Sequence, residues 1–198
     1  MDVKSRKAEQ SETTRAALIG AARPLFAERG YAGVGTEEIV RAAGVTRGAL
    51  YHHFDGKREL FRAVYEMVEA ELVQRIAQET MSAGDPVEAL HAGARAFLDA
   101  VEDPAVQRIT LLDAPSVLDW EEWREIGMRY GLGLVQATLQ AAIDAGSIPS
   151  QPVAPMAHLL LGALDEAALL IARSNDVKRA RREVGDAIER LLDALVAT

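Results

Sequence analysis

The feature that most constrains this chain is a glycine between two short amphipathic stretches within residues 34–60. Apolar residues recur at helical spacing around Ile39, Gly44 interrupts them, and Val45 and Leu50 resume an apolar face. A glycine permits the backbone conformation that a sharp bend between two short helices requires. The pattern therefore predicts a helix-turn-helix, followed directly by the start of a third helix.

The second helix of this motif carries side chains that can bond to DNA, because such a helix fits the major groove. The Arg47 guanidinium can pair with two acceptors of guanine, and Gly48 would let the backbone approach the duplex. Thr46 and Ala49 can contact a thymine methyl group, although Thr46 can equally cap the helix. We therefore expect this chain to bind DNA, with Arg47 as the main base reader.

The run AGVTRGALYHHF with the following Lys57 resembles the N-terminal signature of the TetR family of bacterial transcriptional regulators. The family pattern is roughly apolar-x-x-A-G-V-(S/T)-x-G-x-L-Y-x-H-F-x-x-K. The resemblance extends back through residues 18–31 and covers about the first 65 residues. Val34 and Gly35 stand where the family usually has Thr or Ser, so the hydroxyl moves to Thr36.

The resemblance implies that Tyr51, His53 and Lys57 bind DNA phosphates. His52 can also bind a phosphate. The alternative for Tyr51 and His53 is packing at the helix junction. The complete set of expected DNA contacts is Thr36, Thr46, Arg47, Gly48, Ala49, Tyr51, His52, His53 and Lys57.

The charge of the chain is divided unevenly along its length. The total is −8, but residues 1–60 carry ten basic and eight acidic residues, whereas the other 138 carry twelve and 22. DNA binding needs positive charge where the phosphates lie, not a positive total. This division fits a DNA-binding head on an acidic body.

Alanine and leucine dominate a sequence with few aromatic residues, and no segment alternates polar and apolar residues as a strand would. We therefore expect an all-α fold of about nine helices, with a helix-turn-helix head at residues 1–56 and a helical ligand-binding and dimerisation body at 57–198. Residues 1–10 are expected to form a mobile arm. The expected helices are residues 11–29, the helix-turn-helix pair, 57–81, 86–101, a short helix after Pro104, 119–145, 153–173 and 177–197.

The last two expected helices are the candidate dimer surface. One side of the first holds Leu159, Gly162, Ala163, Glu166 and Leu170, and the second has a stripe of Val184, Ile188, Leu191 and Leu195. Such stripes are usually core, but the resemblance favours pairing through these helices as a four-helix bundle. Two heads about 34 Å apart could then read successive major grooves.

The body also contains polar and aromatic residues among apolar helices, which suits a pocket for a small molecule. For each of them, a place in the core or on a solvated face is the alternative. The residues expected to bind ligand are His91, Arg95, Asp113, Trp120, Trp123, Tyr130, His158 and Glu166.

The sequence thus predicts a dimeric regulator, more specifically a repressor, that binds a pseudo-palindromic operator and is released by a small-molecule inducer. The alternatives are a ligand-independent DNA-binding protein and a helical enzyme or ligand carrier with a vestigial DNA motif. No cysteine, no G-x-S-x-G serine and no metal-ligand spacing among the four histidines occur, so we expect no enzyme activity, cofactor or metal. No signal peptide is recognisable and no apolar run approaches the ~20 residues that cross a bilayer, so we expect a cytoplasmic protein without a membrane partner.

Overall fold

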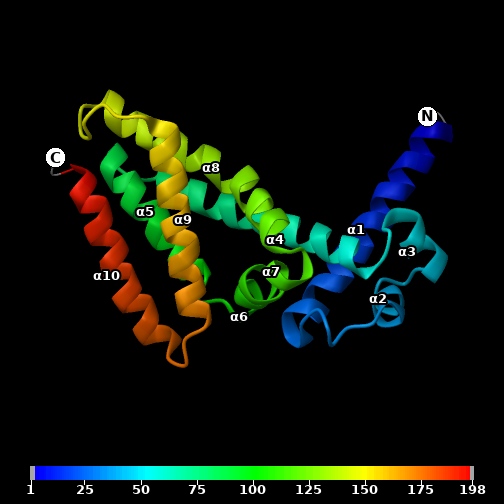
Figure 1. Ribbon diagram of the computed structural model, residues 1–198. Helices are drawn as coiled ribbons and strands as arrows, with labels where there is room; N and C mark the ends of the chain where they lie inside the picture. Colours follow the sequence, from blue (N-terminus) through cyan, green and yellow to red (C-terminus); the bar gives the residue numbers. More distant parts are fainter. Residues whose placement is uncertain (1–2, 197–198) are drawn as a thin grey trace.

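The computed structural model describes residues 3–196, with side chains from Glu9 onward, and this part of the chain contains helices and no strand. The prediction of an all-α fold is therefore confirmed (Figure 1). The elements are α1 (Val3–Arg29), α2 (Thr36–Ala42), α3 (Arg47–His53), α4 (Lys57–Met81), α5 (Pro86–Ala100), α6 (Pro104–Val106), the π-helical turn η1 (Gln107–Asp113), α7 (Ala114–Val117), α8 (Trp120–Asp144), α9 (Val153–Ala172) and α10 (Val177–Val196).

Helix starts in the body are fixed by aspartate caps. The Asp85 carboxylate accepts from the backbone N–H groups of residues 87 and 88, and Asp103 does so from residue 105. A proline follows each of these caps, where its missing N–H costs nothing. Asp119 caps α8 with φ at 68°, a conformation that aspartate tolerates better than most residues. Gly146 takes φ of 72° just beyond the end of α8.

Two segments differ from the sequence expectations. The expected arm at residues 1–10 is helical from Val3, because residues 3–14 contain good helix formers and neither glycine nor proline. The side chains of residues 1–8 lie outside the described part. After Pro104, one continuous helical segment runs to Val117 through η1, a longer element than the short helix expected there. With this segment counted once, the described residues form nine helices, as predicted.

The core begins in the head and continues along α4. Phe26 and Phe61 are fully buried with ring centroids 5.2 Å apart, and Tyr31 packs edge-on against Phe61 at 5.3 Å. Beyond them, Val64, Val68 and the following apolar residues of α4 are buried against the body. Helix α4 therefore runs from the head into the body (Figure 1).

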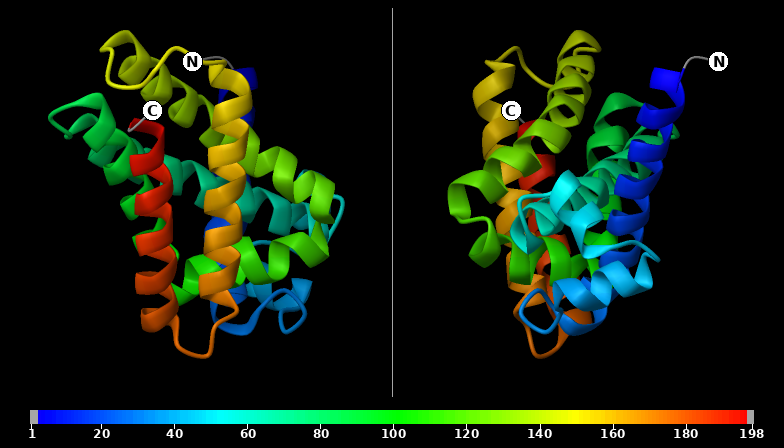
Figure 2. Two further views of the ribbon diagram at one scale, coloured as in Figure 1. Left: turned by 60° about the vertical axis from the view of Figure 1, so that its left-hand side comes forward. Right: turned by 90° about the vertical axis from the view of Figure 1, so that its right-hand side faces the viewer.

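In the body, α5 and α8 pack against α4, α9 packs against α5 and α8, and α10 packs against α5 and α9. Helices α9 and α10 lie side by side at the end of the molecule farthest from α2 and α3 (Figures 1 and 2). By length and composition, α9 is the one described helix apolar enough to cross a membrane, which the sequence analysis did not foresee. Seven of its residues are buried against neighbouring helices, so α9 is a core helix of the body.

Candidate DNA-binding and ligand sites

Helices α2 and α3 form the expected helix-turn-helix. Gly44 lies just after α2 with φ of 66°, and the N–H of Val45 donates to the carbonyl of Val40 at 3.0 Å. Buried Ile39 and Leu50 hold the two short helices against the head. In the molecule as a whole, α3 lies at the end away from α9 and α10 (Figure 1).

The outer face of α3 and its flanks carry most of the predicted DNA contacts. Residues 46, 47, 48, 51 and 52 are exposed, and Ala49, His53 and Thr36 are partly exposed. Thr46 also caps α3, because its hydroxyl oxygen accepts from the N–H of Ala49 at 3.2 Å. Thr36 begins α2, where Gly35 provides the cap position without a side-chain bond. The structure thus places the predicted contacts on one accessible region, and their contact with DNA stays a prediction.

The guanidinium of Arg47 is held by two neighbours in the absence of DNA. Its Nη1 lies 3.0 Å from Glu37 Oε1, and its Cζ lies 5.5 Å from the centre of the Tyr51 ring. The Arg47 side chain is still 64% exposed, so the pair with Glu37 is an exposed one and worth little. A phosphate or base edge can therefore replace Glu37 at small cost. Sequence reasoning missed Glu37, which precedes Arg47 by ten residues.

Lys57 has a structural function that the sequence did not indicate. Its ammonium donates to the backbone carbonyls of Tyr31 and Val34, both at 2.9 Å, and lies 4.0 Å from the centre of the Tyr31 ring. Through these two hydrogen bonds, Lys57 links the start of α4 to the loop between α1 and α2. One N–H remains for a phosphate, so the predicted DNA contact is compatible with this arrangement.

Replacing Lys57 with methionine should lower the free energy of unfolding by about 2–4 kcal/mol, because two hydrogen bonds from a charged donor are lost. Methionine preserves an apolar stem beside Tyr31. Urea unfolding measures the change, and the same substitution at exposed Lys178 should alter the free energy by less than about 0.5 kcal/mol. Equal unfolding free energies for the two variants would contradict the assigned function of Lys57.

A cavity of about 100 Å³ lies within the body, between α4, α5, η1, α8, α9 and α10. Apolar residues form most of its wall, including Leu72, Ile76, Phe97 and Trp123. Its polar and charged lining residues are Tyr65, Glu69, Thr80, Thr110, Arg124, Thr138 and Asp165. A mostly apolar cavity with a few polar groups is typical of a small-molecule site.

Of the eight residues predicted to bind ligand, Trp123 alone lines this cavity. The other aromatic residues are close to it without lining it. Trp120 is 53% exposed and its ring centroid lies 4.7 Å from that of Trp123, whereas Tyr130 packs partly buried against the core.

The charged members of the predicted set have other partners or lie on the surface. His91 is buried between Glu189 and Asp193 of α10, and Arg95 pairs with Glu88 and Glu189. Asp113 accepts a hydrogen bond from the head, and His158 and Glu166 are exposed on α9. Ligand contact by any of these residues stays a prediction, but the structure does not bring them together around the cavity.

Sequence reasoning missed Glu69 as a cavity residue. Burial and, to a smaller extent, the nearby charge of Asp165 raise the pKa of Glu69 to about 7, and the contact with the Tyr65 hydroxyl opposes this shift. The signal in the sequence was that Glu69 falls on the apolar stripe of α4, four residues after Tyr65 and three before Leu72.

Asp165 of α9 faces the same cavity as Glu69. Burial raises the pKa of Asp165 to about 6, and the positive charge of Arg124, 3.6 Å away, opposes that shift. In the sequence, Asp165 follows a run of six apolar or glycine residues, which marks it as a candidate for a buried acid.

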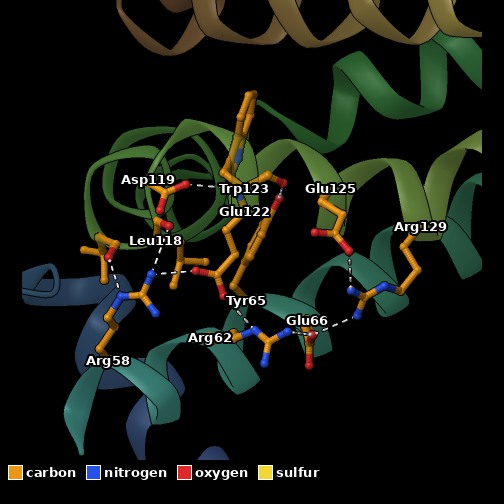
Figure 3. Close-up of polar contacts among 11 residues, drawn as sticks. Arg58, Arg62, Tyr65, Glu66, Leu118, Asp119, Glu122, Trp123, Glu125 and Arg129 are labelled. Atoms are coloured by element: carbon orange, nitrogen blue, oxygen red, sulfur yellow. Dashed lines mark hydrogen bonds and ion pairs between the residues drawn. The ribbon is translucent and has the colours of Figure 1, made fainter.

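The start of α4 is tied to α7 and α8 by polar contacts (Figure 3). Arg58 donates to the carbonyls of Val117 and Leu118, both at 3.0 Å, and pairs with Glu122 at 2.5 Å. The Nε of Arg62 lies 2.9 Å from the same Glu122 carboxylate. These contacts connect the helix that follows the head directly with the start of the helix that bears Trp123.

A second connection links the head to η1. The N–H of Tyr31 donates to Asp113 Oδ2 at 2.7 Å, and a Cβ at Gly30 would lie 3.2 Å from that oxygen. In addition to α4, elements α6 and η1 therefore contact α1 of the head directly.

Two family models match the chain on either side of the junction. Residues 18–64 match the bacterial regulatory proteins of the tetR family, and residues 87–195, more than half of the chain, match the tetracyclin repressor-like C-terminal domain. The chain belongs to the TetR family. It is therefore a DNA-binding transcriptional regulator, as the resemblance in the sequence implied.

Individual relatives extend over most of this TetR-family protein. The Transposon Tn10 TetC protein of Escherichia coli is 29% identical over 162 residues, 82% of each chain. A TetR-family regulator from Pectobacterium atrosepticum has a crystal structure with a TM-score of 0.88 and 34% identity, covering 96% of this chain and 97% of that one. RolR, crystallised with resorcinol, shares the fold, with a TM-score of 0.73, 24% identity and coverage of 93% and 89%.

Proposed function

We propose that this TetR-family regulator is a homodimeric, cytoplasmic repressor that binds a pseudo-palindromic operator and is released by a small molecule bound in the body cavity. The observation that carries the proposal is the presence in one chain of an exposed α3, which bears Arg47, and a mostly apolar cavity lined in part by α4, the helix that continues from the head. A repressor needs only to occupy DNA and obstruct polymerase. The proposed DNA contacts are the nine residues predicted from the sequence.

Exposed leucines on α9 support dimerisation. Leu159 and Leu170 are 69% and 53% exposed, and their spacing of eleven residues places them on one face of the helix. On α10, Leu191 is 43% exposed, whereas Ile188 is buried and Leu195 packs against the protomer's own core. Large apolar side chains gathered at one end of a soluble protein favour an interface there. The face of α9 is therefore the main candidate surface.

The hydrogen bonds around Trp123 support a structural connection through which ligand binding in the cavity could move the head. The Trp123 indole N–H donates to the carbonyl of Thr110 in η1 at 2.7 Å, and its own carbonyl accepts from the Tyr65 hydroxyl at 3.2 Å. Both partners lie on elements that also touch the head, η1 through Asp113 and α4 through Lys57. A ligand against Trp123 would thus move the heads by shifting these elements, provided that it binds the displaced state more tightly. The bound resorcinol of RolR is consistent with a ligand in such a body.

Selection of bound duplexes from a random DNA pool tests the proposed function. We expect a pseudo-palindromic motif, because two-fold related heads impose their symmetry on the site. Recovery of a lone asymmetric half-site would contradict the proposal that a dimer binds the operator. Recovery of no motif, with tight binding of small molecules retained, would favour the alternative of a ligand carrier with a vestigial DNA motif.

A further inference from the structure

The cavity of the body contains an acid for which the protein provides no cation. Glu69 of α4 lines the cavity, and among the described residues no arginine, lysine or histidine lies within ion-pair distance of it. Asp165 of α9 lines the same cavity and is 3.6 Å from Arg124, the one basic residue of the lining. Two carboxylates and one guanidinium thus line a mostly apolar space.

This charge balance disfavours an anionic ligand and favours a cationic one. An unpaired carboxylate in apolar surroundings is costly, and the protein offers Glu69 only the hydroxyl of Tyr65 nearby. A cation entering the cavity would supply the missing partner. The Arg124 guanidinium is already beside Asp165, so an anion would meet no free positive charge.

We propose that the ligand of this regulator is a small apolar molecule with one protonated amine, which Glu69 binds while Asp165 adds attraction from the opposite helix. This inference rests on the proposed function, because the proposed function assigns the cavity as the ligand site. Phe97, Trp123 and Tyr65 supply aromatic surface, and aromatic faces attract cations as well as apolar groups. The volume of about 100 Å³ is somewhat below that of an engineered cavity of ~150 Å³ that binds benzene, which limits the ligand to about one ring.

Calorimetric titration with three probes of one shape separates the possible charges. The probes are 2-phenylethylamine as the cation, 2-phenylethanol as the neutral molecule and 3-phenylpropanoate as the anion, each at pH 8 with DNA-free protein. We expect the amine to bind at least tenfold more tightly than the alcohol, and the anion not to bind. Equal or tighter binding of the alcohol or the anion overturns the proposal, and so does failure of all three to bind.

Substitution of Glu69 tests whether its carboxylate is the group that binds the amine. Glu69→Gln should weaken amine binding at least tenfold and leave alcohol binding within about threefold, because the shape of the side chain is preserved. Glu79→Gln is the matched control, since Glu79 is an exposed acid of the same helix outside the cavity. If Glu69→Gln does not fold, Asp165→Asn replaces it, with a smaller loss of amine affinity expected. Unchanged amine affinity in the folded variant overturns the proposal.

Amine affinity should also depend on pH in a defined direction. The amine stays protonated between pH 6 and 8, so a fall in affinity must come from protonation of the carboxylates, whose pKa values are about 7 for Glu69 and about 6 for Asp165. Tyr65 and Arg124 are the other titratable groups facing the site, and the lining residues from α5, η1 and α10 carry none. Affinity should fall roughly tenfold from pH 8 to pH 6 in the wild-type protein and much less in Glu69→Gln. An affinity that does not change with pH contradicts the assignment.

The two proposals fail separately. DNA selection is performed without any probe, so an operator recovered from a protein that does not bind the amine refutes the ligand class alone. Amine binding by a protein that selects no DNA motif refutes the proposed function and leaves the chemistry of the cavity intact.

Discussion

Replacing Leu159 and Leu170 with glutamate should split the dimer and abolish tight operator binding. Each leucine withdrawn from water contributes about 1.5–3 kcal/mol, and a symmetric interface contains both residues twice. Burying carboxylates in their place adds a desolvation cost. A total loss above about 4 kcal/mol corresponds to at least a 10³-fold rise in the dimer dissociation constant. Because one head then binds without the other, operator affinity should fall by roughly 10²-fold or more.

Sedimentation at micromolar concentration measures the oligomeric state of this variant. Both leucines are exposed in the protomer, so the fold and the unfolding temperature of the monomer should be retained. Met81→Glu is the control, because Met81 is an apolar residue that is 84% exposed but belongs to α4 instead of α9 or α10. That control should remain a dimer. A dimer with both leucines replaced would show that the interface lies elsewhere on the molecule.

Arg47→Ala should weaken binding to the selected operator by about 1–3 kcal/mol and remove the preference at one base position. The expected loss comes from a bidentate contact to guanine, less the small benefit of the exposed pair with Glu37. Binding to unrelated duplexes should change little beyond the loss of one positive charge. This variant therefore separates reading of bases from attraction to phosphates.

Fluorescence anisotropy with the operator, with single-base variants of it and with unrelated DNA measures this effect. Tyr51→Phe is the matched comparison on the same helix, because it removes a hydroxyl able to reach a phosphate and retains the ring beside Arg47. We expect that variant to weaken binding to all duplexes alike. If both variants reduce specific and unspecific binding equally, α3 is not the helix that reads the bases.

The fold was predictable because it depends on local signals. Gly44 between two apolar stretches, the aspartate caps at Asp85 and Asp119, and Gly146 beyond α8 each fix a turn within a few residues. The π-helical turn η1 was not predictable in this way. Its sequence has no distinctive marker, and its residues pack against α1, α4 and α9, which lie far from it in the chain.

The candidate DNA surface was predictable for the same reason, since its residues lie within one short motif. The exceptions are Glu37 and Lys57, whose partners are set by the packing of α1, α2 and α4. The ligand cavity was not predictable, because six elements line it and the sequence does not show which faces turn inward. His91 illustrates the difficulty, since its partners Glu189 and Asp193 lie about a hundred residues away.

The central claim is that two heads of one dimer bind the same face of an operator. The most direct test compares affinity for the selected operator with affinity for a version lengthened by five base pairs at its centre. Five base pairs are about half a helical turn, so the half-sites then lie on opposite faces of the duplex. The account predicts a loss of roughly 10²-fold or more, because the second head can no longer bind. Equal affinity for the two duplexes would contradict it.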